Sequence, residues 1–170
     1  MLQRVDHLRL LARYNAWMNE RLYATAMKLP DEELAEDRGA FFGSILATLN
    51  HIMVADTIWL KRFATHPDGL PALEPMLSCR IPGLDEGWPY ADIRSLRQRR
   101  QELDAMIPTW TENLREENLD LPLTLRCAAA KPIPTPSSRW WRTASTIRCI
   151  IAGRSRPCCR RRGWTWVTQT

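Results

Sequence analysis

The chain has 170 residues, of which 45% are hydrophobic and 25% are charged, and it carries a formal net charge of +5. This length fits one domain with a sizeable core, and the composition is ordinary for a globular protein. No run approaches the roughly 20 apolar residues that a membrane span needs. The first ten residues, MLQRVDHLRL, lack the apolar core of a signal peptide. We therefore expect a cytoplasmic protein without a membrane partner.

The first predicted helix covers about residues 5–29. The residues of its predicted buried face recur at intervals of three and four, which is the helical period. Pro30 ends the helix, because proline disfavours the helical conformation in the residue before it. The predicted buried face consists of Leu8, Leu11, Ala12, Asn15, Met18, Leu22 and Ala26.

The second predicted helix covers about residues 42–64, within the stretch FFGSILATLNHIMVADTIWLKRF. It is apolar on nearly all sides, which indicates a helix buried among neighbours. Its one histidine, His51, shares a side with small residues such as Ala47 and Ala55, so other groups have room to approach the ring. His51 is either a hydrogen-bonded core residue or one ligand of a metal site, because a single ligand does not make such a site.

Asp56 lies on the side of this helix that carries the larger residues. A buried carboxylate needs a partner, so we interpret Asp56 as the partner of an arginine in preference to a catalytic residue. The following residues, 65–90, are rich in proline and glycine and are predicted to form a long irregular loop. His66, at the start of that loop, is expected to be exposed to solvent.

The third predicted helix covers about residues 92–118, with Asp92 as its N-cap. Pro108 is a point at which this helix can kink or stop. A short extended segment follows, and residues 1–125 together form the predicted helical domain. The apolar stripe of the helix also contains one arginine, and its members are Ile93, Leu96, Arg100, Leu103, Ile107, Trp110 and Leu114.

After Leu125 the chain loses both helical and strand periodicity. Residues 126–170 are rich in arginine, tryptophan, proline and serine, and they contain four of the five cysteines. The spacing of these cysteines fits neither a disulfide framework nor a zinc site. Three long helices precede this tail, and no fourth helix follows, although a helical bundle normally closes with a fourth.

An out-of-frame reading of a GC-rich gene gives a composition of this kind, and the genetic code tests the idea. Each shifted codon takes the third base of one residue and the first two bases of the next. The junction of Trp140 and Trp141 must then give valine, and that of Cys158 and Cys159 must give leucine. With C or G favoured at ambiguous third bases, the junctions from Ser145 to Arg154 can read Asn-His-Gln-(Val or Met)-His-His-Arg-Gly-Gln.

The first and last histidines of this shifted reading are four residues apart, on one face of a helix. A two-histidine metal clamp has this arrangement. We therefore predict that a base was lost or gained between about codons 125 and 139, so that residues 126–170 are an aberrant, frameshifted tail or a sequencing error. The alternative is a genuine, disordered tail.

Three motifs resemble the DinB family of DNA-damage-inducible metalloenzymes, which is related to the bacillithiol and mycothiol S-transferases. They are YNAWMNERLY at residues 14–23, DRGAFFGSILATLNHIMVADTIWLKRF at residues 37–63, and LRQRRQELD in the third helix. The resemblance covers about residues 2–125. It implies an all-α four-helix bundle, commonly a homodimer, in which the aberrant tail replaces the last helix.

The resemblance also implies a divalent metal, namely zinc, nickel or iron, that three histidines bind. One of these matches His51. The other two form a His-x-x-x-His pair on the last helix, near where this sequence has Ile147, Ile150 and Ile151. Tyr14 and Asn15 recur in the family motif, and either packing or a role in the site explains them.

The implied function is that of a metal-dependent thiol S-transferase or hydrolase, which acts on a small electrophile and has a low-molecular-weight thiol as a partner. Three imidazoles hold the metal and leave positions open for water or substrate. Two other readings stay open. One is a metal-free, catalytically dead remnant. The other is a nucleic-acid binder that uses the arginine-rich tail, but basic charge alone gives non-specific binding to phosphates, and no recognition motif accompanies it.

Overall fold

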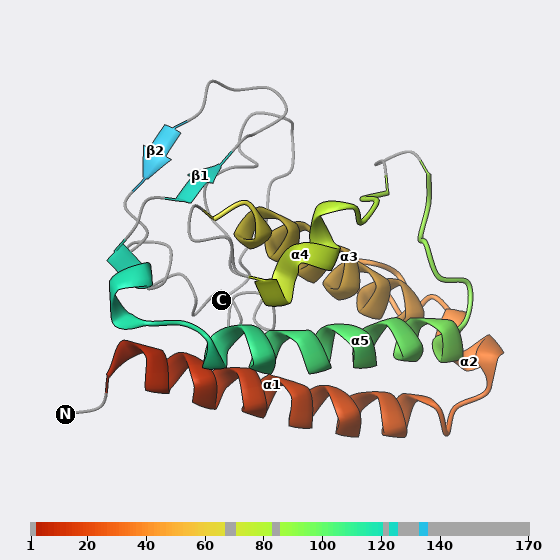
Figure 1. Ribbon diagram of the computed structural model, residues 1–170. Coiled ribbons are helices and arrows are strands. Elements are labelled where there is room, and N and C mark those ends of the chain that lie inside the picture. Colours follow the sequence, from red (N-terminus) through yellow and green to blue (C-terminus); the bar gives the residue numbers. More distant parts are fainter. Residues whose placement is uncertain (1–2, 67–70, 83–85, 121–122, 126–132, 136–170) are drawn as a thin grey trace.

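The computed structural model describes residues 3–66, 71–82, 86–120, 123–125 and 133–135 (Figure 1). Three long helices form its body: α1 (Arg4–Ala26), α3 (Ile45–Ala64) and α5 (Ile93–Glu112). The shorter elements are α2 (Asp31–Ala35), α4 (Glu74–Leu77) and two 3-10 helices, η1 (Pro71–Leu73) and η2 (Glu116–Asp120). Strands β1 (Leu123–Leu125) and β2 (Ile133–Thr135) pair in an antiparallel ladder, with Leu123 opposite Thr135.

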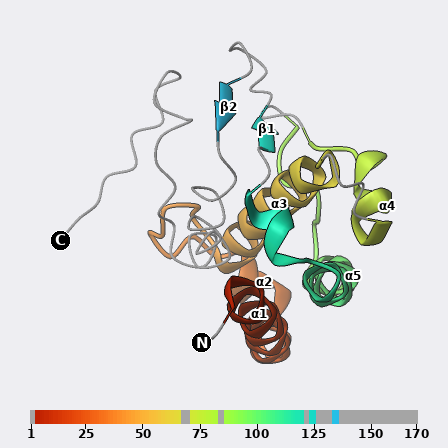
Figure 2. The same ribbon diagram turned by 60° about the vertical axis from the view of Figure 1, so that its left-hand side comes forward.

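Helices α1 and α5 lie side by side along their length (Figure 1), and this is the most extensive contact between elements. Figure 2 shows both of them nearly end-on, with α3 running across one side of the pair. The predicted all-α bundle is confirmed, since long helices occupy the three predicted regions. Two further predictions are the domain boundary at residue 125 and the aberrant tail in place of a fourth helix. Both concern residues 126–170, of which the structure describes only residues 133–135, so both stay predictions.

The core lies where the three long helices meet. Each helix contributes side chains that are at most 5% exposed, and burying one large aliphatic side chain stabilises the fold by roughly 1.5–3 kcal/mol. Every member of the stripe predicted for the third helix is buried, including Arg100, although the last member, Leu114, follows the end of α5. The central apolar residues are Leu8 and Ala12 of α1, Leu49, Met53 and Leu60 of α3, and Leu96, Leu103 and Ile107 of α5.

The predicted buried face of α1 is only partly right. Leu8, Ala12 and Asn15 are buried, but Met18 is 38% exposed and Leu22 is 46% exposed. The reason is that α1 carries apolar residues on two faces, and the face against α5 continues through Asn19 and Tyr23 instead. A pattern of apolar residues alone does not decide between two such faces.

The helix boundaries follow from their caps. Helix α3 begins at Ile45, later than predicted, because Oγ of Ser44 accepts a hydrogen bond of 3.1 Å from the backbone N–H of Ala47. The predicted cap of α5 is confirmed, since the Asp92 side chain accepts from the backbone N–H groups of the two residues that follow Ile93. Pro108 lies inside α5 without ending it, and the helix stops at Glu112 before the chain turns into η2.

The loop predicted for residues 65–90 contains regular structure, so that prediction is wrong in part. η1 and α4 occupy Pro71–Leu73 and Glu74–Leu77. Leu73 and Met76 are almost completely buried, and their burial holds this turn against the core. Pro75 is tolerated because it lies in the first turn of α4, where a helix does not need its backbone N–H.

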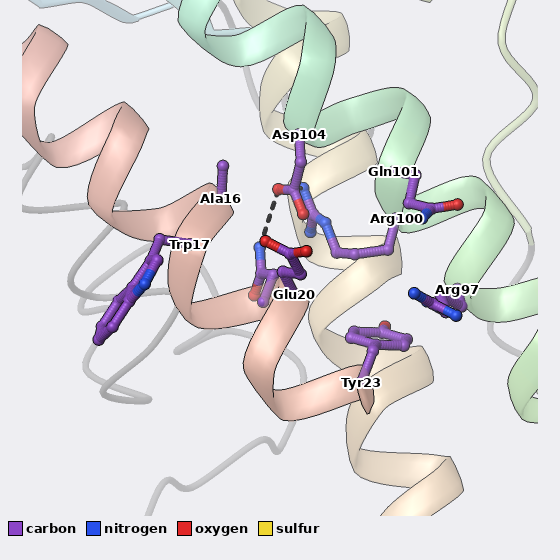
Figure 3. Close-up of a pocket in the computed structure, with 9 residues that line it drawn as sticks. Ala16, Trp17, Glu20, Tyr23, Arg97, Arg100, Gln101 and Asp104 are labelled. Carbon is purple, nitrogen blue, oxygen red and sulfur yellow. Dashed lines mark hydrogen bonds and ion pairs between the residues drawn. The ribbon is translucent and has the colours of Figure 1, made fainter. Parts of the chain in front are cut away.

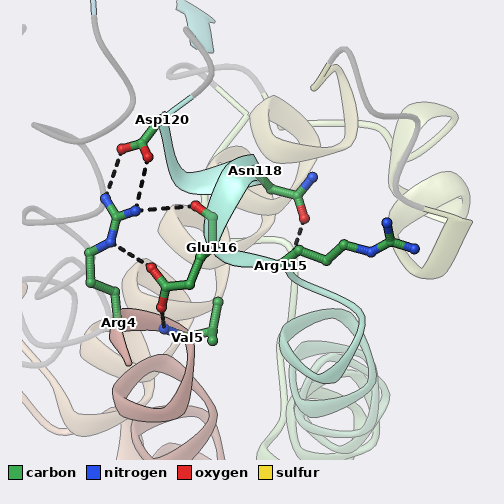
Figure 4. Close-up of polar contacts among 6 residues, drawn as sticks. All are labelled: Arg4, Val5, Arg115, Glu116, Asn118 and Asp120. Carbon is green, nitrogen blue, oxygen red and sulfur yellow. Dashed lines mark hydrogen bonds and ion pairs between the residues drawn. The ribbon is translucent and has the colours of Figure 1, made fainter. Parts of the chain in front are cut away.

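A polar clamp joins the start of α1 to η2 (Figure 4). The guanidinium of Arg4 lies 2.7 Å from a carboxylate oxygen of Glu116 and 2.8 Å from one of Asp120. The other oxygen of Glu116 accepts a hydrogen bond of 2.9 Å from the backbone N–H of Val5. This N–H and then Arg4 lower the pKa of Glu116. The carboxylate therefore caps α1 where the helix dipole favours negative charge.

Crossing a membrane would take a longer and more apolar helix than any in the described part of the chain.

Candidate functional site

His51 lies in the second turn of α3 and is half-buried. Its ring stacks on the ring of Phe42, with the centroids 3.9 Å apart and the planes inclined by 23°. The ring of Trp88 stands edge-on to it, with a centroid distance of 6.3 Å and an angle of 85°. Phe42 and Trp88 also contact each other, at 5.9 Å. The three rings form one aromatic cluster, in which both Phe42 and Trp88 contact the imidazole ring.

Phe42 reaches this position through the tight turn before α3. Gly43 has a φ of +78°, which a residue with a side chain rarely adopts. Its N–H donates to the carbonyl of Ala40 at 2.7 Å, and its own carbonyl accepts from the N–H of Arg38 at 2.9 Å. The turn places Phe42 beside the second turn of α3, where His51 stands.

Trp88 is held by the neighbour of His51 in the sequence. The amide of Asn50 donates to the carbonyl of Tyr90 at 3.0 Å and accepts from the N–H of Tyr90 at 3.1 Å. Asn50 is completely buried, so these bonds join the segment that precedes α5 firmly to α3. Since Trp88 lies two residues before Tyr90, the same bonds bring its ring to His51.

Burial lowers the pKa of His51 below its ordinary value of 6.5. The imidazole is therefore neutral at neutral pH, and one of its ring nitrogens carries a lone pair. A neutral imidazole is the form that binds a metal ion or accepts a proton. The ring of Phe42 covers one face of this imidazole.

The sequence profile of the DinB family matches residues 1–135. The chain belongs to the DinB family. This match includes all three long helices, and it spans well over half of the chain. No curated protein and no solved structure matches the chain.

The chain contains three histidines. The sequence contains His7, His51 and His66 and no histidine after them. His7 is exposed on α1, and His66 follows the end of α3. The described residues contain no group of three His, Cys, Asp or Glu side chains that could hold a metal ion. The region in which the His-x-x-x-His pair is predicted lies outside the described residues.

The predicted exposure of His66 is wrong, because this residue is only 4% exposed. The chain turns back at the end of α3, where the backbone N–H of His66 donates to the carbonyl of Phe63 at 3.0 Å. This turn directs the residue inward and away from solvent. The residue composition of the loop gave no signal of that turn.

Asp56 pairs with an arginine, as predicted. It is 5% exposed, and its carboxylate accepts from Nη1 of Arg100 on α5. Burial raises the pKa of Asp56, and the adjacent guanidinium opposes that rise. On Arg100, burial alone would lower the pKa, but Asp56 and Asp104 together raise it. The pair joins α3 to α5 and gives Asp56 a structural role.

The two residues of the DinB motif on α1 have different surroundings. Asn15 is 5% exposed, whereas Tyr14 is 50% exposed. The ring of Tyr14 contacts that of Trp17, with the centroids 5.9 Å apart. Neither residue belongs to the aromatic cluster around His51, so the site in the described residues consists of His51, Phe42, Trp88 and the supporting Asn50.

Proposed function

We propose that this DinB protein derives from a divalent-metal enzyme in which His51 is a metal ligand. The observation that supports this proposal is the state of His51, a half-buried imidazole that contacts Phe42 and Trp88 and whose pKa is lowered by burial. A metal ligand requires this state, because protonation would remove the lone pair that it donates.

The proposed metal is zinc, nickel or iron, all of which imidazole ligands suit. When bound, such a metal lowers the pKa of a coordinated water or thiol and makes a nucleophile available near neutral pH. The described residues of this chain supply one such imidazole, and the sequence has no histidine beyond residue 66. The described residues therefore do not complete a three-histidine site, and we assign the activity to the chain with its reading frame restored.

The proposed reaction is the transfer of a low-molecular-weight thiol to a small electrophile, or the hydrolysis of such a compound. Phe42 and Trp88 present an apolar wall beside His51, and Trp88 is 45% exposed. Such a wall suits the apolar part of a small organic substrate. We further propose that the protein is a homodimer in solution, which light scattering of the purified protein would test.

A second candidate follows from the histidine count. With His51 as the one site imidazole, the affinity for a metal should be largely lost. The chain in its present sequence would then be a metal-free, inactive remnant of the DinB scaffold. The nucleotide sequence separates the two candidates, because only the first requires a frame change after codon 125.

The test begins with resequencing of the gene across codons 125–139. Protein with the restored frame is then incubated with a low-molecular-weight thiol, an aromatic electrophile and each of the three metals, and the loss of free thiol is measured. We expect metal-dependent thiol loss that His51→Ala abolishes. His7→Ala is the matched control and should leave it unchanged, because His7 is exposed on α1. Confirmation of the present frame, or full activity in His51→Ala, would reject the proposal.

A further inference from the structure

A pocket of about 360 Å³ lies between α1 and α5 (Figure 3). Nine residues line it, all from these two helices, so His51 and the aromatic cluster take no part in it. The volume falls within the range of pockets that bind small molecules. The pocket is therefore a candidate site that is separate from the proposed metal site.

The floor of the pocket carries the carboxylate of Asp104, which is one of two lining carboxylates. Asp104 accepts a hydrogen bond of 2.8 Å from the amide of Asn19 and lies 3.0 Å from Nη2 of Arg100. The same guanidinium pairs with Asp56 of α3. Two carboxylates thus share one cation in a largely buried place. Burial raises the pKa of Asp104 to about 6, with Arg100 and Asn19 opposing the rise, so Asp104 is ionised at neutral pH.

The rim adds a further carboxylate near this floor. Glu20 of α1 lines the pocket on the side of Asp104 and forms no ion pair with any described residue (Figure 3). The remaining cation of the lining, Arg97, lies at the Tyr23 end of the pocket, and its Nη1 is 3.1 Å from the sulfur of Met27. The part of the pocket near Asp104 therefore favours a cation over an anion.

Tyr23 and Trp17 provide the other features of a cation site. Tyr23 is 3% exposed and lines the pocket, and its hydroxyl forms no hydrogen bond with a described residue. A phenol oxygen can accept a hydrogen bond from an ammonium group. The ring of Trp17 is 47% exposed and already has one cation over its face, the guanidinium of Arg21 at 4.4 Å from the centroid.

We propose that this pocket binds a small organic amine in its protonated form. The ammonium group lies between the carboxylates of Asp104 and Glu20, at the end of the pocket away from Arg97. The apolar part of the amine lies along Trp17. None of the lining residues belongs to the aromatic cluster around His51 or to the tail, because all of them precede residue 105.

The test compares three probes of similar size: benzylamine, neutral benzyl alcohol and anionic benzoate. Binding to the full chain is followed by the NMR shift of the Trp17 indole N–H, which is assigned from a Trp17→Phe spectrum. We expect saturable binding of benzylamine alone, and Asp104→Asn should weaken it about tenfold, the effect of losing one charge-assisted hydrogen bond. Glu102→Gln is the matched control and should change it less than about twofold, because Glu102 pairs with Arg99 outside the pocket.

Glu20→Gln guards against a folding defect in Asp104→Asn, because Glu20 is exposed and makes no contact on which the fold depends. It should weaken the binding of benzylamine and leave the rest of the spectrum in place. Three results would overturn the proposal. They are equal binding of benzylamine and benzyl alcohol, tighter binding of benzoate, and no saturable shift with benzylamine up to tens of millimolar.

Discussion

The surroundings of His51 depend on its neighbour Asn50. The Asn50 side chain forms three hydrogen bonds of 3.0–3.1 Å, one to the carbonyl of Leu46 and two to the backbone of Tyr90. The bonds to Tyr90 connect positions 40 residues apart in the chain. One buried amide therefore decides whether Trp88 reaches the candidate site.

Substitution of Asn50 tests this role. Asn50→Ala leaves the N–H and the carbonyl of Tyr90 without their partner, so the free energy of unfolding should fall by about 2 kcal/mol. Urea denaturation measures the loss, and the NMR signal of the His51 ring should shift as Trp88 moves away. Asn113→Ala removes an exposed amide at the end of α5 and should cost less than about 0.5 kcal/mol. Equal losses in the two variants would contradict this role.

The position of His51 on a buried helix, with small residues on its side, could be predicted from the sequence. The identity of the rings beside it could not. Phe42 reaches His51 through a turn at Gly43, and Trp88 reaches it through hydrogen bonds of Asn50. Both contacts depend on loop geometry, which leaves no periodic signal in the sequence.

Asp104 makes the stability of the protein depend on pH. Its pKa in the folded protein is about 6, against 3.8 as the ordinary value. Between these values the folded state binds more protons than the unfolded state. The protonation of Asp104 therefore adds to the free energy of unfolding, and this contribution is complete below about pH 3.8 and is lost as the pH rises through 6. When the pH is lowered from 7 to 4, the free energy of unfolding of the wild type should rise by about 2 kcal/mol relative to that of Asp104→Asn. Guanidinium denaturation at several pH values measures this gain, and parallel pH curves for the two proteins would contradict it.

At the scale of elements, α3 and α5 are joined by the pair of Asp56 and Arg100. The sequence predicted that Asp56 has an arginine partner, and it predicted Arg100 on the buried stripe of α5. Both predictions are confirmed. The contact between these two residues could not be predicted from the sequence, because the register between two helices depends on the packing of all of their side chains.

Breaking this pair should be costly. Asp56→Asn leaves Arg100 buried without its closest counter-charge, and the free energy of unfolding should fall by about 3 kcal/mol. Chemical denaturation measures the loss. The double variant Asp56→Leu, Arg100→Met removes both charges and should recover most of the stability. A double variant that is as unstable as Asp56→Asn would show that the charge pair is not the cause.

For the whole molecule, the three long helices α1, α3 and α5 of a DinB bundle are described, and the core lies where they meet. The all-α class and the family could be predicted because apolar periodicity and three motifs extend over most of residues 1–125. A fourth helix in the restored frame would bury further apolar surface, at about 25 cal/mol per Å². Protein with the restored frame should therefore melt at a higher temperature than the present chain in calorimetry. An equal or lower melting temperature would contradict the frame change.

The metal content of the restored-frame protein tests the central claim most directly. Its stoichiometry can be measured by mass spectrometry of the metals after exhaustive dialysis, beside that of His51→Ala and His7→Ala. We predict about one divalent ion per chain in the restored protein and in His7→Ala, and none in His51→Ala. Metal-free protein with the restored frame, or a His51→Ala variant that keeps its metal, would contradict the assignment of His51 as a ligand.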